Sequence, residues 1–254
     1  MLKNLNNTIE SLNFKFVNPD DDPNSNFSYK INKYLFYLNT LINYREIRHF
    51  TFFQNTISKF KETEFINFSK SMSSIEGMST IANAWIINQI CSELKENECY
   101  VNIGCWKGFS LIAGMINTKC SVFGVDNFAW KEFGKKDFYK NYLKYENSEK
   151  HYFYEGDYIK FLKEWENKKK FIDFYFYDGP HTYKDQFQSL EIASNYFRSG
   201  SIILVDDTNW EEPREATMEF ISINSGKYKI LYDLKCKNAR HPTFWNGLII
   251  FQKI

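Results

Sequence analysis

The stretch "FIDFYFYDGPHTYKDQ", from Phe171 to Gln186, combines a strand pattern with an abrupt polar end. Six of its first seven residues are apolar or aromatic, as in a strand buried on both faces of a parallel sheet. The run then breaks into Asp178, Gly179, Pro180 and His181. Glycine and proline alone would make a turn, so the flanking carboxylate and imidazole need another reason. This strand end is therefore a candidate functional site.

Short apolar strands alternate with helical segments from residue 76 onward. Strands are expected at residues 99–104, 121–128, 172–179, 201–207, 227–235 and 244–253, with a further strand ending before Asp157, and helices at 109–117, 158–168, 183–197 and 213–223. This alternation is typical of βαβ units with helices on both faces of a parallel sheet. The last two strands have no helix between them, so at least one should run antiparallel at the sheet edge. We therefore predict an α/β fold with a doubly wound, mostly parallel, Rossmann-like seven-stranded sheet and an antiparallel last strand.

The first 75 residues carry no chemical motif. Residues 1–25 end in the polar run "NPDDDPNSN", so we expect a flexible tail there. In residues 26–75 apolar side chains such as Ile31, Leu35, Leu38 and Ile42 recur at helical spacing, which predicts a helical extension. That extension would serve as a lid or as the face of a homodimer. Residues 76–254 are expected to form the α/β domain.

Composition excludes several classes of protein. The 254 residues hold 32 Lys and Arg against 31 Asp and Glu, and a net charge of +1 argues against a nucleic-acid partner. No run of 18 apolar residues occurs, so no membrane partner is expected, and the N-terminus lacks the apolar core of a secretion signal. The five cysteines are scattered without a Cys-x-x-Cys pair, which disfavours a zinc cage and predicts reduced thiols in the cytoplasm.

Polar residues also follow the other expected strands. In "YVNIGCWKGFS", Gly104 and Gly108 frame a strand-to-helix turn suited to anionic groups. Its G-x-x-x-G spacing differs from the G-x-G-x-x-G of nicotinamide oxidoreductases, which argues against that class. Asp126, followed by Asn127, ends the next strand and suits a ribose diol. Asp157 and Tyr158 precede a helix that Asp157 could simply cap.

Three carboxylates are expected to meet at one sheet edge. Asp178 ends one strand, and Asp206 and Asp207 end the next. Because the ends of neighbouring parallel strands lie together, these like charges need a cation or a shared proton. A hard divalent ion with oxygen ligands, such as Mg²⁺, satisfies this need. The alternative is that one Asp caps a helix while another faces solvent.

The chain from about Glu76 to the C-terminus resembles class I S-adenosylmethionine-dependent methyltransferases, most closely the metal-dependent O-methyltransferases of the catechol and sugar type. "VNIGCWKGFS" is similar to their cofactor turn, except that Asn102 stands where an acidic residue is usual. The "EGM" segment, with Gly77 and Met78, resembles the one that closes over the cofactor. Asp178 and the Asp206-Asp207 pair stand where these families bind their metal.

The resemblance implies a role for each matching position. The methionine moiety of the cofactor would lie among Asn102, Gly104, Trp106, Gly108 and Ser110, its ribose by Asp126 and Asn127, and its adenine by Asp157 and Tyr158, with Gly77, Met78 and Asp178 as further cofactor contacts. Asp178, Asp206 and Asp207 would hold the metal. His181, three residues after Asp178, would be the catalytic base beside that catalytic carboxylate.

We therefore predict an S-adenosylmethionine-dependent, divalent-metal-assisted O-methyltransferase of a small hydroxylated acceptor: a sugar, a catechol-like ring or another natural product. Two alternatives stay open. One is a non-catalytic module that binds a nucleotide-like ligand on the same fold. The other is an N-methyltransferase, although amino-directed enzymes that act on nucleic acids commonly carry Asn/Asp-Pro-Pro-aromatic where this chain has Asp-Gly-Pro-His.

Overall fold

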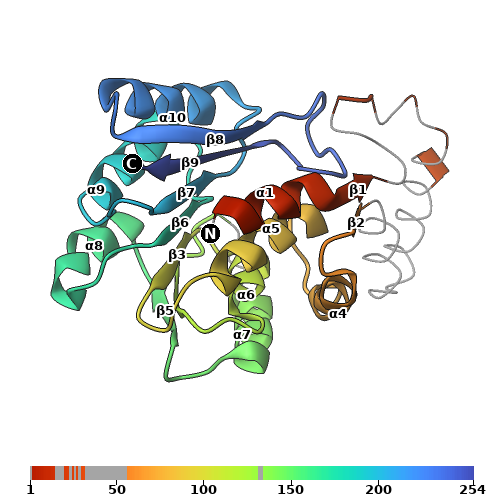
Figure 1. Ribbon diagram of the computed structural model, residues 1–254. Helices are drawn as coiled ribbons and strands as arrows, with labels where there is room; N and C mark the ends of the chain where they lie inside the picture. The colour runs from red at the N-terminus through yellow and green to blue at the C-terminus, as the bar shows by residue number, and fades with distance from the viewer. Residues whose placement is uncertain are drawn as a thin grey trace.

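The computed structural model describes residues 2–14, 20–22, 25, 27, 30–31, 56–130 and 134–254. Within them a seven-stranded sheet has the order β5-β4-β3-β6-β7-β9-β8, with helices on both of its faces (Figure 1). The strands are β3 (Cys99–Ile103), β4 (Ser121–Asp126), β5 (His151–Glu155), β6 (Phe174–Tyr177), β7 (Ile202–Val205), β8 (Tyr228–Leu234) and β9 (Leu248–Lys253). The prediction of a mostly parallel, Rossmann-like sheet is confirmed.

Strands β3 to β7 are parallel, and β9 runs antiparallel to both β7 and β8. The antiparallel last strand is confirmed, but its expected place at the sheet edge is wrong. It inserts between β7 and β8, which leaves β8 at the edge. Strand order reverses at β3, whose neighbours are β4 and β6. The carboxyl ends of β3, β4 and β6 therefore frame the point at which such sheets bind ligands.

Strand residues alternate between two hydrophobic cores, one on each side of the sheet. On one side Tyr100, Phe174 and Phe176 pack beneath α5 (Ile81–Ser92), α6 (Phe109–Met115) and α7 (Gly134–Tyr145). On the other side Val101, Tyr175 and their neighbours pack beneath α8 (Tyr158–Lys163), the 3₁₀ helix η2 (Trp165–Lys168), α9 (Tyr183–Ser194) and α10 (Glu211–Ile223). This period of two is the pattern of strands buried on both faces.

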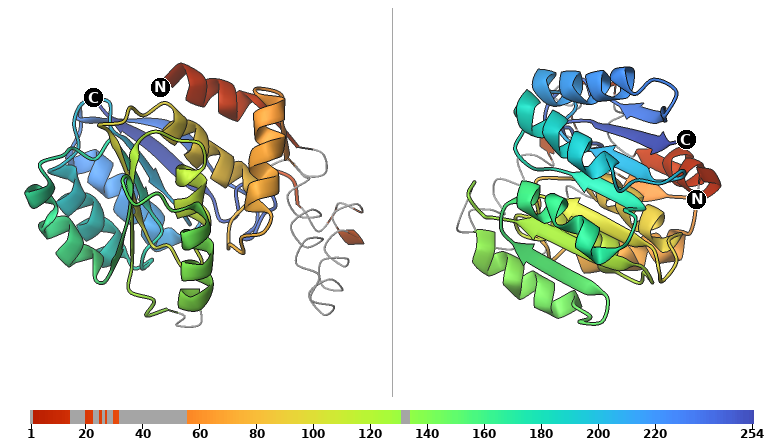
Figure 2. Two further views of the ribbon diagram at one scale, coloured as in Figure 1. Left: turned by 90° about the horizontal axis from the view of Figure 1, so that it is seen from below. Right: turned by 90° about the vertical axis from the view of Figure 1, so that its left-hand side faces the viewer.

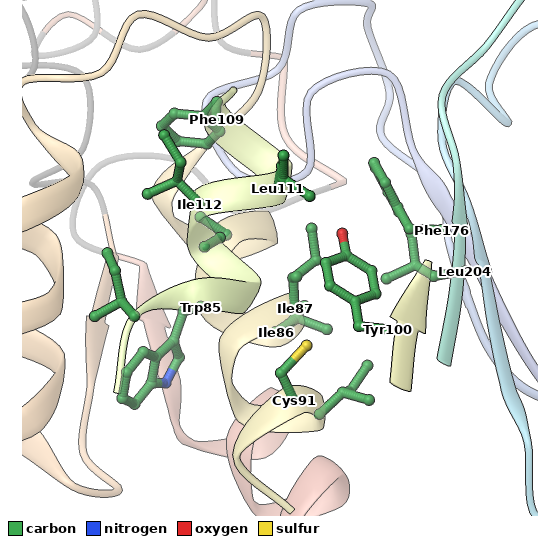
Figure 3. Close-up of a cluster of buried hydrophobic side chains, with 14 of the residues drawn as sticks. Trp85, Ile86, Ile87, Cys91, Tyr100, Phe109, Leu111, Ile112, Phe176 and Leu204 are labelled. Atoms are coloured by element: carbon green, nitrogen blue, oxygen red, sulfur yellow. The ribbon is translucent and has the colours of Figure 1, made fainter. Parts of the chain in front are cut away.

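Helix α5 is buried on nearly all sides because further elements cover it. Figure 3 shows its Ile86 and Ile87 near Tyr100 of β3, with α6 alongside. On its outer side lies α4 (Glu62–Met72), and the rings of Phe65 and Phe68 lie 5.3 and 5.2 Å from that of Trp85. The elements that precede the sheet in sequence thus add a further layer to one face of the domain (Figure 2).

The described part of residues 1–25 corrects the prediction of a flexible tail. Residues 2–11 form α1 (Leu2–Ser11), in which Leu5 is buried in the core shared with α5. The chain continues into β1 (Leu12–Phe14), which pairs antiparallel with β2 (Thr56–Ser58). Strand β2 lies where the sequence predicted helix, whereas most of the predicted stripe from Ile31 to Ile42 falls outside the described residues. None of the helices described is long and apolar enough to span a membrane.

Candidate active site at the carboxyl ends of the strands

The turn after β3 and the end of β6 touch through a glycine. Gly104 has a φ of +83°, and a Cβ added to it would lie 1.9 Å from the peptide oxygen of Asp178. No residue with a side chain fits this approach, so glycine is required here for both conformation and space. Gly108, with a φ of +94°, ends the turn as the N-cap residue of α6. The predicted glycine turn and the predicted acidic strand end are therefore in direct contact.

Asp126, at the end of β4, holds the glycine turn from the other side. Its Oδ2 accepts hydrogen bonds of 2.7 Å from the backbone N–H groups of Cys105 and Trp106, and its Oδ1 accepts one from Phe128. A carboxylate oxygen can accept more than one hydrogen bond, so ribose contacts remain compatible with these three. Asp126 thus has a structural task that the sequence did not reveal. Its ribose role stays a prediction.

Asn102 and Ser110 lie beneath the turn rather than on its surface. Asn102 is fully buried, and its Oδ1 accepts a hydrogen bond of 3.1 Å from the hydroxyl of Ser110. The Asn102 amide also approaches the carbonyl oxygen of Gly104 at 3.4 Å. This polar pair therefore links β3 to the first turn of α6 and supports the shape of the loop between them.

A buried lysine ties the turn to two distant segments. Lys107 Nζ lies 2.9 Å from a carboxylate oxygen of Glu76 and 2.9 Å from one of Asp137 on α7. Burial alone lowers the pKa of Lys107, but the hydrogen bonds to Asp137 and Glu76 outweigh it and raise the pKa above its ordinary value. The "EGM" segment is thereby fixed against the turn. Sequence reasoning missed Lys107, although its place inside G-x-x-x-G was the available signal.

Gly77 and Met78 of the "EGM" segment lie beside the start of α6. A Cβ on Gly77 would lie 2.5 Å from the ring of Phe109, so this segment packs closely on that helix. Met78 is 40% exposed. The segment therefore lies next to the glycine turn, as the sequence predicted, while its contact with a cofactor stays a prediction.

The residues predicted to lie near the adenine and ribose have structural partners of their own. Asp157 caps α8 by accepting a hydrogen bond from the N–H of Lys160, as its sequence context allowed. Tyr158 is buried against Tyr177. Asn127 is exposed and accepts a hydrogen bond from the N–H of Ala129. All three follow the ends of β4 and β5, and their cofactor roles stay predictions.

The acidic cluster consists of Asp178, Asp207 and His181. Ligand atoms of these three side chains lie within 4.8 Å of one another, as a metal site requires. His181 Nε2 is 3.0 Å from Asp207 Oδ2 and 3.9 Å from Asp178 Oδ1. Asp206, the third predicted metal ligand, does not belong to this group: it is buried, and its Oδ1 accepts the N–H of Asp207.

The cluster concentrates negative charge. Burial raises the pKa of Asp178 well above its ordinary value, and the charges of Asp206, Asp207 and Asp126 raise it further. Burial and the charge of Asp207 likewise raise the pKa of Asp206. Because 36% of the Asp178 side chain is exposed, solvent moderates the effect there. The site as a whole favours bound protons or a cation.

Two further side chains contact members of the cluster. The ring of Trp210, at the N-cap of α10, lies 5.1 Å from the His181 ring in an edge-to-face arrangement, and Trp210 is 43% exposed. The Asn246 amide donates a hydrogen bond of 2.7 Å to Asp207 Oδ1. Sequence reasoning found neither residue, since neither belongs to a strand-end motif; the bulky Trp210 three residues after Asp207 was the only local signal.

Comparison with known proteins agrees with this geometry. Residues 101–208, which contain the glycine turn and the acidic cluster, match a family described as a methyltransferase domain. Among the curated proteins no sequence matches this chain.

Solved structures share the fold at low sequence identity. An O-methyltransferase from Bacillus cereus, determined with SAH, has a TM-score of 0.55 at 12% identity, over 76% of this chain and 92% of that one. A cofactor-bound protein from MTB has a TM-score of 0.54 at 11% identity, over 75% and 88% of the two chains. A protein from Corynebacterium glutamicum has a TM-score of 0.53 at 8% identity, over 77% and 91%.

The family match and the strand order lead to the same conclusion, and the prediction of a methyltransferase is confirmed. Residues 101–208 therefore form a methyltransferase domain set in a Rossmann-like fold.

Proposed function

We propose that this chain transfers a methyl group from S-adenosylmethionine to a hydroxyl oxygen of a small acceptor, such as a sugar, a catechol-like ring or another natural product. One observation carries the proposal. The glycine turn that would hold the donor packs directly on Asp178, the first residue of the acidic cluster. A donor on the turn and an acceptor at the cluster would therefore be neighbours, and positioning supplies much of the catalysis in such a transfer.

The donor side is formed by the turn and by the ends of β4 and β5. S-adenosylmethionine supplies a methyl group that its sulfonium charge already activates. In the proposal the turn from Gly104 to Gly108 holds the methionine moiety, Asp126 the ribose, and the segment after Asp157 the adenine. The carboxylates of Asp126 and Asp178 lie close enough for their charges to interact, and such a field favours a cationic donor.

The acidic cluster fits a hard divalent cation such as Mg²⁺. Asp178 and Asp207 would hold it, with Asp206 beside them. The donor set is suitable because Mg²⁺ prefers carboxylate oxygens and because these charges need compensation. When bound, such an ion lowers the pKa of an acceptor hydroxyl and orients adjacent oxygens.

His181 is the proposed acceptor of the hydroxyl proton. Its Nε2 faces the two carboxylates, whereas its Nδ1 is buried and has no hydrogen-bond partner among the described residues. Uptake at Nε2 requires the neutral ring to carry its hydrogen on Nδ1. Asp207, at 3.0 Å, would then stabilise the imidazolium that forms. The oxygen of the acceptor loses its proton to His181 and forms a bond to the methyl carbon, while the bond between that carbon and the sulfonium sulfur breaks and S-adenosylhomocysteine leaves.

The aromatic ring of Trp210 would border the acceptor. It is partly exposed and lies against His181, so an acceptor at the cluster would meet an apolar face beside the polar groups.

The boundaries of the domain are also part of the proposal: residues 76–254 form the methyltransferase domain. The side chain of Asp22 accepts a hydrogen bond from Asn238, which supports contact between the N-terminal extension and the loop after β8.

A transfer assay tests the function. Purified protein receives S-adenosylmethionine labelled in its methyl group and a panel of catechols, sugars and amines, with Mg²⁺ or with a chelator. We expect label on a hydroxyl acceptor and a decrease of about 10²–10⁴-fold in His181→Gln. The matched control is Asp233→Asn, which removes an exposed carboxylate on β8 that pairs with Arg214.

Other outcomes identify the alternatives. Label on an amine alone would indicate an N-methyltransferase. Binding of the donor product without transfer to any acceptor would indicate a binding module. Transfer that His181→Gln leaves unchanged would refute the assigned base.

A further inference from the structure

The loop between β8 and β9, residues 235–247, reaches the acidic cluster from the far end of the sequence. A bridge closes its second half, since the backbones of His241 and Trp245 exchange hydrogen bonds of 2.8 and 3.0 Å. Thr80, the N-cap residue of α5, donates a hydrogen bond of 2.5 Å to the carbonyl oxygen of Thr243. The loop is therefore held in place by contacts other than those it makes with the acidic cluster.

Asn246 is the residue of this loop that contacts the cluster. Its side-chain nitrogen donates to Asp207 Oδ1 at 2.7 Å, and its side-chain oxygen accepts the N–H of Arg240 at 2.7 Å. The second contact defines the orientation of the amide, because only the oxygen can accept from an N–H. Its backbone carbonyl also accepts a hydrogen bond of 2.7 Å from the N–H of Asn209. Asn246 is 4% exposed, so water does not compete strongly for these contacts.

The two oxygens of Asp207 have separate partners. Oδ1 receives the amide of Asn246, and Oδ2 faces His181 Nε2 at 3.0 Å. The backbone of Asp207 has a φ of +58°, which aims the side chain in a direction that an ordinary strand end would not give. Rotation of this carboxylate would break the contact with Asn246 and that with His181 together.

We propose that Asn246 is a positioning residue that fixes the rotation of the Asp207 carboxylate and so presents Oδ2 to His181. The inference deepens the proposed function and rests on it, because Asp207 Oδ2 faces the nitrogen of His181 that the proposal places beside the acceptor. Asn246 touches neither a reacting atom nor His181. It acts through Asp207, as residues behind an active group commonly do.

Asn209 provides a matched control. It anchors the same loop, since its side chain donates to the carbonyl oxygen of Cys236 at 2.7 Å and accepts from the N–H of Cys236 at 3.1 Å. Because these side-chain hydrogen bonds go to Cys236 and not to Asp207, Asn209→Ala loosens the loop without removing the donor to the cluster. A purely structural role of Asn246 would make the two alanine variants alike.

The test reads the imidazole of His181 directly. Nitrogen-15 resonances of the ring are recorded by NMR at about pH 8, above the ordinary imidazole pKa, and assigned with His181→Gln, which is simple among four histidines. We expect Asn246→Ala to shift the Nε2 resonance and Asn209→Ala to leave it in place. Asn246→Asp keeps the size of the side chain but places an acceptor against Asp207, so it should also shift the Nε2 resonance. This second variant tests the positioning role if Asn246→Ala does not fold.

Two results separate this inference from the function on which it rests. His181 resonances that coincide in the wild type and in a folded Asn246 variant would overturn the positioning role, even with intact binding of S-adenosylhomocysteine. Calorimetry on the same samples shows whether the protein binds S-adenosylhomocysteine at all. Failure of the wild type to bind S-adenosylhomocysteine would remove the proposed function, whatever the NMR spectra show.

Discussion

The peptide oxygen of Asp178 occupies the space in which a side chain on Gly104 would begin, so the turn after β3 and the end of β6 form one interlocked unit. Gly104 is needed both for its φ of +83° and for this approach. The donor side and the acceptor side of the proposed site therefore cannot move apart without unfolding the turn.

Gly104→Ala should destabilise the protein by more than about 2 kcal/mol, since a left-handed conformation alone costs about 1–2 kcal/mol for a residue with a Cβ and the added methyl group strikes backbone. Urea unfolding measures the change. Gly226→Ala is the matched control, because Gly226 also has a positive φ of +79° but a methyl group added there would meet no atom within 4 Å. Equal losses of unfolding free energy in the two variants would show that backbone strain, and not the contact with Asp178, explains the need for Gly104.

Lys107→Met should lower both the free energy of unfolding and the affinity for S-adenosylhomocysteine. It leaves the carboxylates of Glu76 and Asp137 facing each other without their shared cation, a change of about 1–3 kcal/mol for partly buried groups. Unfolding and calorimetry measure the two effects. Lys135→Met removes the exposed pair with Glu155 and should cost less than about 1 kcal/mol. A Lys107 variant with unchanged affinity would exclude a role for this network at the cofactor side.

His151 should make stability depend on pH. Burial is the main cause that lowers the pKa of this histidine to about 4, and the nearby charge of Lys150 contributes to the same shift. As the pH falls, His151 binds its proton near pH 6.5 in the unfolded chain but only near pH 4 in the folded chain. The free energy of unfolding is therefore highest above pH 6.5 and decreases as the pH drops toward 4. Between pH 7 and 5 the loss should be about 1–2 kcal/mol. His151→Asn should make the free energy of unfolding depend less on pH. Parallel curves of unfolding free energy against pH for the wild type and the variant would contradict this role of His151.

Asp178→Asn should stabilise the protein in chelator while it strongly lowers activity. Burial and the charges of Asp206 and Asp207 raise the pKa of Asp178, so its ionised form disfavours the fold above its ordinary pKa and the neutral amide relieves this. Activity should fall by about 100-fold or more if Asp178 acts at the reacting groups. Thermal unfolding with and without Mg²⁺ completes the test: the ion should raise the melting temperature of the wild type and not that of the variant. A variant that is less stable than the wild type in chelator would contradict the charge argument.

The features that the sequence predicted are those carried by local patterns. Strand and helix alternation predicted the sheet, and polar residues after apolar runs predicted that Gly104, Asp126 and Asp178 would meet at one edge. The abrupt polar end of the buried strand Phe174–Tyr177 thus has its explanation in the cluster that Asp178 and His181 form with Asp207.

Other features depend on contacts that no local pattern contains. Helix α1 was missed because the polar run that follows it suggested a tail, whereas Leu5 packs on the core. Helix α7 was missed because the large side chains that it buries, Phe138 and Tyr142, are aromatics among many lysines. Asn246 is 39 positions from its partner Asp207, and only the closure of β9 between β7 and β8 brings the two together.

Calorimetric titration with S-adenosylhomocysteine tests the central claim most directly. The wild type, Asp126→Ala and the control Asp233→Asn are titrated in parallel, with NAD as a second ligand. The account predicts binding of S-adenosylhomocysteine but not NAD to the wild type and the control, and a clear loss of affinity in Asp126→Ala. Absence of binding to the folded wild type, with Mg²⁺ present or chelated, would contradict it.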